Sequence, residues 1–423
     1  MSNPHNDNSR QCVDLSKESD SDASSTGGEA KQRSNVNKRR RISRSKNNSE
    51  SKSTSGTAAA TAAAVPDNVS SLSRPHLQPV IDNASSSLSY TNDSPPTSNN
   101  IESSLHMIGD DTKNKYTNHK IVQSLLDLRR WARTHDHFRN EFFKLAGIPR
   151  VLKFLNVPSN MANMEYVYLS CGVICSCINK GQNDENVVIA KAIVSQFVER
   201  GGIQLMLLAN EEYSGGNDSQ QLRAISSIWF AFMRVFMFMS TMAIDKDTLF
   251  RIIDDALATL RLMNGVKHKT IVSNIFSAVQ NLLVTNHAMI EASDFGTRNF
   301  FQTCVDAMND TDGNWEYNEP VWNKATRLFR ICLNDDLFST ENNDNLKLVI
   351  SFMVEYIKIS PNDAFESHAF KFLHKACDVL DKNVMLNVPG LMSKIGSMLD
   401  PITSNGINDE TKDAAKALMK KLC

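Results

Sequence analysis

The chain has 423 residues with 46 basic and 47 acidic side chains, and its formal net charge of −1 indicates no global field for nucleic acid or anionic lipid. Eight cysteines are too sparse for a disulfide scaffold, and the polar start Met1–Asp7 predicts no secretory signal peptide. We therefore expect a protein with reduced thiols in the nucleus, the cytoplasm or both.

Residues 1–112 differ in composition from the rest of the chain. They hold 25 serines and six of the twelve prolines, but a single aromatic residue, Tyr90. A segment with so few large apolar side chains cannot bury enough surface to offset the entropy lost on ordering. The sequence predicts that residues 1–112 form a long disordered N-terminal tail.

A dense basic run lies inside this predicted tail. Residues 31–52 contain nine basic side chains and one acidic side chain, with four consecutive cations at Lys38, Arg39, Arg40 and Arg41. An exposed run of this kind is typical of a signal read by a nuclear import receptor, and the alternative is a solvating basic patch. Ser43 follows the run as a candidate phosphosite, because a phosphate there would reduce the local charge by about two.

From about residue 113 the pattern changes to long apolar-periodic segments separated by short polar loops. Apolar side chains recur at i, i+3, i+4 and i+7, as they do over 125–132 and 252–260, and no segment alternates for long. The sequence therefore predicts an all-α fold over residues 113–423.

Two copies of a repeated unit are recognisable in this region. Residues 143–155 and 197–208 each contain an aromatic residue, a Gly-Ile pair and an apolar helix. A second, more buried helix follows each copy, over 165–179 and 220–242, and further helices of this kind begin near 268, 320, 366 and 410. This periodicity predicts about six degenerate repeats in a solenoid.

The segment Leu128–Leu155 resembles a junction between armadillo repeats. In that family a helix ends in a Leu-Ala-like pair, and a turn, a short helix, a Gly-Ile-Pro sequence and the next helix follow; here Gly147-Ile-Pro precedes the next helix. The resemblance implies a right-handed armadillo-like α-solenoid whose third helices line a concave groove for a peptide or a protein. Paired Trp and Asn residues four apart, typical of importin-alpha, are missing, since Met233 and Thr326 follow Trp229 and Trp322 at that spacing.

Polar residues recur along the predicted third helices and are candidate groove residues. Amide side chains on such a face can bond to the main chain of an extended peptide, and the alternative is a hydrated helix face. The first two stripes are Ser273, Asn274, Ser277, Gln280 and Asn281, then Asn323, Arg327 and Arg330; the third is Lys371, Lys375 and Asp378.

A basic face is predicted at the start of the solenoid. Residues 113–153 carry ten basic and three acidic side chains, and Arg129, Arg130 and Arg133 share one flank of a helix. This face fits an acidic partner or a nucleic-acid backbone, and the alternative is the solvated outer surface of a capping repeat.

No catalytic or phosphate-binding fingerprint is present, so the sequence predicts neither an enzyme nor a cofactor.

Cys171, Cys175 and Cys177 point in different directions from one helix, which favours packing over zinc binding. The loop 308–319 resembles a calcium loop but has Met308 at the first ligand position, so a plain connection is predicted. The apolar segment 228–244 contains Arg234 and is interpreted as a central solenoid helix rather than a membrane span.

The functional prediction is a non-enzymatic scaffold or adaptor that binds a protein or an extended peptide along the concave surface. Two alternatives stay open at this stage. One is a nucleic-acid-associated protein that uses the basic tail and residues 113–153. The other is an armadillo-type co-chaperone.

Overall fold

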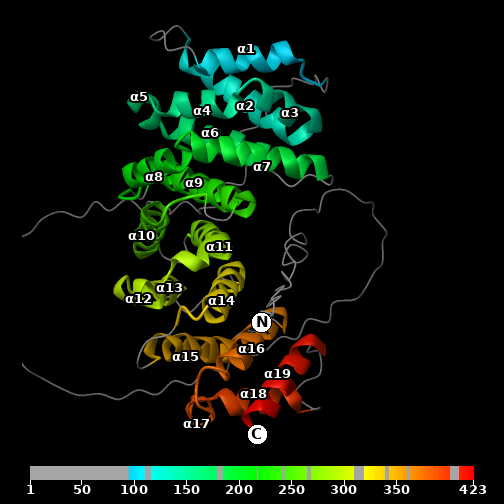
Figure 1. Cartoon of the computed structure of the whole chain (residues 1–423), viewed down its shortest axis with the longest axis vertical. Helices are drawn as coiled ribbons and strands as arrows, with labels where there is room; N and C mark the ends of the chain where they lie inside the picture. Colours follow the sequence, from blue (N-terminus) through cyan, green and yellow to red (C-terminus); the bar gives the residue numbers. More distant parts are fainter. Residues whose placement is uncertain are drawn as a thin grey trace, which may run out of the picture. The chain divides into compact units, whose positions relative to one another are not determined.

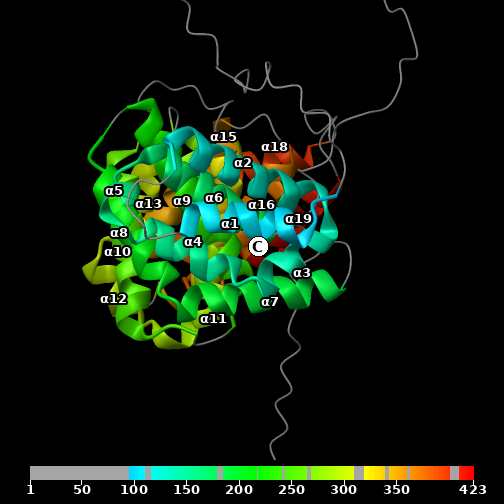
Figure 2. The same ribbon diagram turned by 90° about the horizontal axis from the view of Figure 1, so that it is seen from above.

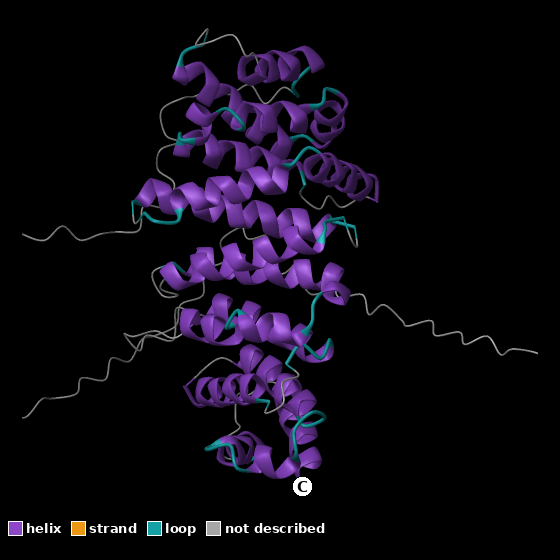
Figure 3. Cartoon of the chain, turned by 60° about the vertical axis from the view of Figure 1, so that its left-hand side comes forward, coloured by secondary structure: helices purple, strands orange, loops and turns teal. Residues whose placement is uncertain are grey.

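The computed structural model describes residues 95–109, 116–178, 184–216, 218–240, 243–263, 268–308, 319–338, 343–359, 363–400 and 409–423. Every regular element in these residues is helical, and they contain no strand (Figure 3). They all belong to one compact unit, Leu88–Cys423. The import signal predicted at Lys38–Arg41, the candidate phosphosite Ser43 and most of the loop 308–319 lie outside the described residues.

The helices follow one another with short connections. In chain order they are α1 (Ser98–Gly109), α2 (Asn118–Thr134), α3 (Asp136–Lys144), α4 (Gly147–Leu155), α5 (Pro158–Met161), α6 (Met164–Cys177), α7 (Asp184–Glu199), α8 (Gly202–Tyr213), α9 (Ser219–Phe238), α10 (Lys246–Leu262), α11 (Lys269–Asn286), the 3-10 turn His287–Met289, α12 (Ala292–Thr297), α13 (Phe300–Met308), α14 (Glu319–Asn334), α15 (Asp344–Ile359), α16 (Asp363–Ala376), α17 (Lys382–Leu386), α18 (Leu391–Leu399) and α19 (Asp409–Leu422).

Seven helices form a continuous column, which we call the third-helix column. Each packs against the next in the order α2, α6, α9, α11, α14, α16 and α19 (Figure 1), and the layers overlie one another when viewed end-on (Figure 2). After α2, these helices begin at residues 164, 219, 269, 319, 363 and 409. These positions confirm the predicted second helices of the repeats to within three residues.

One or two further helices precede each member of the column and pack beside it. The pairs α3/α4, α7/α8, α12/α13 and α17/α18 precede α6, α9, α14 and α19, whereas α10 and α15 alone precede α11 and α16. Units of two short helices and one long helix are the armadillo pattern, and units of two helices are the related HEAT pattern. The predicted fold class, an all-α armadillo-like solenoid, is confirmed.

The predicted disordered tail extends too far along the chain. Helix α1 lies within residues 1–112, packs against α2 and α4, and buries Ile101, Leu105 and Ile108 on one face. These three residues have the i, i+4, i+7 spacing of an amphipathic helix, but the serines and asparagines around them make the segment polar as a whole. The described solenoid therefore begins with α1.

The core is one apolar cluster that runs from Ile101 to Leu422. Trp229 is fully buried at its centre, and its Nε1 donates to Oδ1 of the buried Asn210 at 3.1 Å. The amide of Asn210 donates in turn to Asp255 Oδ2 and Thr259 Oγ1, both at 2.9 Å, and so ties α8, α9 and α10 together. Burial raises the pKa of the Asp255 carboxyl to about 6, against the opposing effect of the Asn210 hydrogen bond.

The apolar segment 228–244 supplies most of α9, which packs between α6 and α11 as a central solenoid helix. No helix in the described part of the chain combines the length and hydropathy needed to cross a membrane. The interpretation as a central solenoid helix is confirmed for residues 228–238, which lie in α9.

Two glycines mark equivalent turns in the first two copies of the repeat. A Cβ added at Gly147 would lie 2.5 Å from the ring of Phe142, and one added at Gly202 would lie 2.6 Å from the ring of Phe197. In both copies the aromatic ring covers the glycine five residues further on. The repeated aromatic in the first copy is thus the buried Phe142, rather than its half-buried neighbour Phe143.

We predict that Gly202→Ala lowers the free energy of unfolding by about 1–3 kcal/mol, because the new methyl group overpacks the ring of Phe197. The matched control is Gly396→Ala in α18, where a new Cβ meets no atom within 4 Å. Helix propensity should make the control up to about 1 kcal/mol more stable. Urea unfolding followed by circular dichroism measures both, and equal midpoints would contradict the packing.

Candidate functional site

The exposed faces of the third-helix column carry matching polar stripes. Counted from the first residue of each helix, the fifth positions of α6, α9, α11 and α14 are Tyr168, Arg223, Ser273 and Asn323. The ninth and twelfth positions of α14 are Arg327 and Arg330, where α11 has Ser277 and Gln280. Because these helices stack directly, the stripes adjoin one another and form the candidate site.

The α11 stripe faces solvent less than predicted. Asn274 Nδ2 donates to the carbonyl of Ser226 at 3.3 Å, and Asn281 Nδ2 donates to the carbonyl of Met233 at 3.0 Å. Both carbonyls belong to α9. Ser277 is buried and donates to the Ser273 carbonyl at 2.9 Å, within its own helix. Both asparagine amides therefore hold α11 against α9. The amide of Gln280, which is half-buried, forms no hydrogen bond to α9 among the described residues.

The α14 stripe has polar atoms that are not used inside the protein. Asn323, Arg327 and Arg330 are all half-buried. Asn323 Oδ1 and Arg327 Nε are buried atoms without a hydrogen-bond partner in the described part of the chain. Since a buried donor or acceptor without a partner costs about 1–3 kcal/mol, α14 gains from a ligand that supplies one.

The stripe predicted on α16 is neutralised within the solenoid. Lys371 Nζ lies 2.6 Å from Glu410 Oε1 of α19, and Lys375 Nζ lies 3.8 Å from Asp378 Oδ2. Asp378 also pairs with Lys421 of α19. These cations at the α19 end of the column thus have counter-ions of their own.

The predicted basic face lies at α2, where its three arginines have different partners. Arg130 pairs with Asp127 of the same helix at 2.9 Å. Arg129 Nη1 donates to Tyr168 Oη of α6 at 2.9 Å, and Arg133 Nε lies 3.4 Å from Ser176 Oγ of α6. Helix α1 packs on α2, so α2 is not the outermost helix of the described solenoid, and the role of this basic face stays a prediction.

Three residues of the site were not singled out from the sequence. Tyr168 Oη of α6 accepts a hydrogen bond from Arg129 Nη1. Arg223 of α9 stacks on the ring of Tyr168, with its Cζ 3.9 Å from the ring centroid. Arg234 of α9 stacks on Phe230 at 5.3 Å. The available signal was Arg234 within an apolar stretch of α9, a placement that costs free energy unless the charged group reaches the surface.

Cations are in excess on the column from α2 to α14. The helices α2, α6, α9, α11 and α14 contain ten basic and three acidic residues, in a chain whose net charge is −1. The basic residues are Lys120, Arg129, Arg130, Arg133, Arg223, Arg234, Lys269, Lys324, Arg327 and Arg330, and the acidic ones are Asp127, Glu165 and Glu319.

The three cysteines of α6 are buried free thiols. Burial raises the pKa of Cys171 and of Cys177 to about 12, and it raises the pKa of Cys175 as well. A thiol held in its neutral form is a poor nucleophile and a poor metal ligand, so packing is their role here. Within the described ranges no group of three or more His, Cys, Asp or Glu side chains has the arrangement of a metal site.

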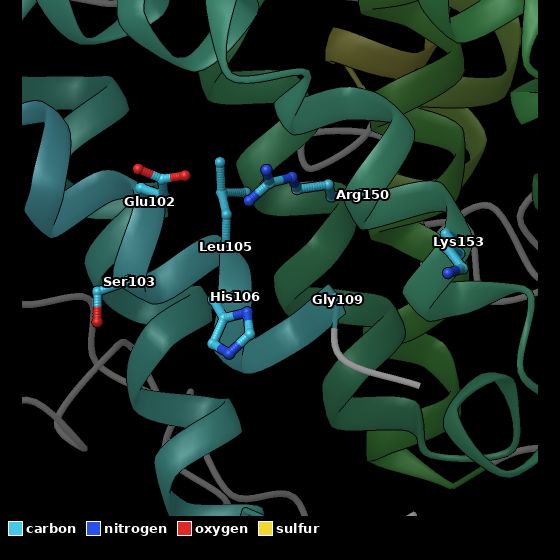
Figure 4. Close-up of a pocket in the computed structure, with 7 residues that line it drawn as sticks. All are labelled: Glu102, Ser103, Leu105, His106, Gly109, Arg150 and Lys153. Carbon is cyan, nitrogen blue, oxygen red and sulfur yellow. The ribbon is translucent and has the colours of Figure 1, made fainter. Parts of the chain in front are cut away.

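Two surface pockets lie elsewhere on the solenoid. One, of about 530 Å³, lies between α1 and α4 and is lined by Glu102, His106, Arg150 and their neighbours (Figure 4). The other, of about 740 Å³, lies between α7 and the end of α9. Neither is lined by residues of the polar stripes.

Comparison with solved structures supports the fold. The chain matches an engineered protein from the Northeast Structural Genomics Consortium at a TM-score of 0.51 and 12% identity, over 76% of this chain and 68% of that chain. It also aligns with a designed armadillo repeat protein at a TM-score of 0.41 and 11% identity, over 76% of this chain and 100% of that chain. A designed armadillo repeat protein in complex with the peptide (KR)4 aligns at a TM-score of 0.40 and 11% identity, over 76% of this chain and 99% of that chain. No protein-family model and no curated protein matches the sequence. The arrangement of its helices makes the protein an armadillo-like α-solenoid.

We predict that Asn281→Ala lowers the free energy of unfolding by about 1 kcal/mol, because it removes the hydrogen bond to the Met233 carbonyl of α9. Its neighbour Gln280, on the same stripe, supplies the control, and Gln280→Ala should change stability by less than about 0.5 kcal/mol. Urea titration of both variants measures the difference. Equal stability would show that the amide does not hold α11 against α9 in solution.

Proposed function

We propose that this protein is a non-enzymatic scaffold that binds an extended segment of a partner protein along the polar stripes from α2 to α14. The observation that carries the proposal is a set of cations on these stripes that have no counter-ion. Arg129, Arg223 and Arg234 form no ion pair with any carboxylate of the described residues, and neither do Arg327 and Arg330.

The geometry of the column suits an extended ligand. Stacked repeats present equivalent positions at regular intervals, and an extended chain presents its side chains and amides at regular intervals as well. Neighbouring helices pack about 8–10 Å apart, which is about three residues of extended chain. One peptide can therefore contact Tyr168 of α6, Arg223 of α9 and Arg327 of α14 in turn.

The localisation of the scaffold is part of the same proposal. The basic run Lys38, Arg39, Arg40 and Arg41 supplies a signal for a nuclear import receptor, and the protein then moves between cytoplasm and nucleus. Replacing these four residues with alanine should move a fluorescent fusion of the full chain from the nucleus to the cytoplasm. An unchanged distribution would leave the run as a solvating patch.

To test the binding surface, peptides are selected from a random library on the full chain and their affinity is measured by fluorescence anisotropy. The variant Arg327→Gln/Arg330→Gln should weaken binding about tenfold or more, because it removes two charge-assisted contacts. Selected peptides should also compete with one another for the same surface.

The control removes the same charge away from the stripes. Arg251 of α10 and Lys347 of α15 are exposed and already paired with Glu211 and Asp344. The variant Arg251→Gln/Lys347→Gln should bind the selected peptides as the unmodified chain does. If both double variants bind equally well, the stripes are not the binding surface, and a steep loss of oligonucleotide affinity with salt would instead favour the nucleic-acid alternative.

A further inference from the structure

Two guanidinium groups converge on one tyrosine at the α2 end of the polar stripes. Arg129 of α2, Tyr168 of α6 and Arg223 of α9 lie on three successive helices of the third-helix column. We call these three residues the arginine–tyrosine cluster. Arg129 Nη1 donates to Tyr168 Oη at 2.9 Å, and the Cζ atoms of Arg129 and Arg223 lie 5.1 and 3.9 Å from the ring centroid.

Both arginines lower the pKa of the Tyr168 hydroxyl. Burial alone raises the pKa of this phenol, but hydrogen bonds from Arg129 and from Arg223 outweigh burial, and the pKa lies below its usual value. The local environment thus favours negative charge at this point on the surface of α6. A neutral phenol places no full negative charge beside the two guanidinium groups.

The side chain of Arg129 lies against α6 at Gly172. A Cβ at Gly172, one turn beyond Tyr168, would lie 2.8 Å from Arg129 Nε, so the guanidinium lies directly against the backbone of α6 at this glycine. Arg129 Nε is buried and has no hydrogen-bond partner in the described residues. Arg129 Nε is therefore a donor that the described chain does not use, and the Nη1 atom of the same guanidinium donates to Tyr168 Oη.

No carboxylate of the described chain balances the two charges. Glu165 is the acidic residue of α6, is exposed, and forms no ion pair with Arg129 or Arg223. Asp127 of α2 is paired with Arg130. Two guanidinium groups held on one ring repel each other, and an anion between them removes that repulsion and accepts hydrogen bonds from their planar forks.

We infer that Arg129, Tyr168 and Arg223 form a subsite for an oxyanion, which is the carboxylate or phosphate of one residue in a bound acidic peptide. This inference rests on the proposed function, because it names the chemistry of the peptide at one end of the stripes. The ring of Tyr168 positions Arg223 by stacking, and its hydroxyl positions Arg129 by a hydrogen bond. Both arginines then donate to the ligand.

The test uses the full chain and short fluorescein-labelled Gly-Ser peptides that carry glutamate, phosphoserine or glutamine at the same positions. The glutamate or phosphoserine peptide should bind and the glutamine peptide should not. Arg223→Gln and Arg129→Gln should each weaken binding about tenfold, as expected for one bidentate charge-assisted contact. The matched control Arg251→Gln, at an exposed position of α10, should leave affinity unchanged.

Arg223→Lys separates a shaped oxyanion site from general positive charge. It keeps the charge but loses the planar fork and the stacking on Tyr168, so most of the affinity should be lost. A preference for phosphoserine over glutamate would identify a phosphorylated residue as the source of the oxyanion, and the opposite preference would identify an acidic residue. Circular dichroism checks that each variant is folded. If an Arg223 variant does not fold, the peptide affinity of Arg129→Gln is compared with that of the unmodified chain instead.

Three outcomes would overturn the inference. These are equal binding by Arg223→Gln and the unmodified chain, full affinity in Arg223→Lys, and tighter binding of a single-stranded oligonucleotide than of either anionic peptide. Library peptides that respond to Arg327→Gln/Arg330→Gln but not to Arg223→Gln would reject the subsite and leave the proposed function standing. Peptides that respond to neither would reject both.

Discussion

Burial of each long helix between two others is the constraint on which this structure depends. Helix α9 has apolar residues on most of its circumference and is covered by α6 on one side and α11 on the other. No single pair of helices in the described solenoid encloses a core, so the stability of each layer comes from its neighbours. A column built in this way leaves only one narrow stripe of each long helix facing outward, and polar side chains gather there.

The side chains on these stripes have two different roles. Some join one layer to the next: Asn274 and Asn281 bond to carbonyls of α9, and Lys371 pairs with α19. Others, Arg129 and Arg327 among them, have buried donor atoms that no group of the described chain satisfies. The first kind holds neighbouring layers together, whereas the second kind is not used by the described chain. The candidate site is therefore confined to the part of the column where the second kind occurs.

The two tryptophans of the column helices α9 and α14 belong to the core and not to the polar stripes. Trp229 and Trp322 are fully buried, and Trp229 bonds to Asn210 inside the core instead of standing on the surface. Guanidinium groups occupy the stripes, stacked on the rings of Tyr168 and Phe230. A surface of this composition suits anionic ligands, since arginine offers both charge and a planar set of donors.

The sequence by itself determined the all-α fold, the solenoid and, to within three residues, the starts of the column helices after α2, because apolar periodicity and turn residues are local signals. It missed α1, whose three buried apolar side chains are diluted by polar neighbours. It also named the stripe residues of α11 and α14 but not which of them are free. Arg129, Tyr168 and Arg223 are far apart in the chain and meet only because helices α2, α6 and α9 stack in register. That register, and with it the distinction between a structural amide and an unused guanidinium, depends on packing between repeats, which only the tertiary structure decided.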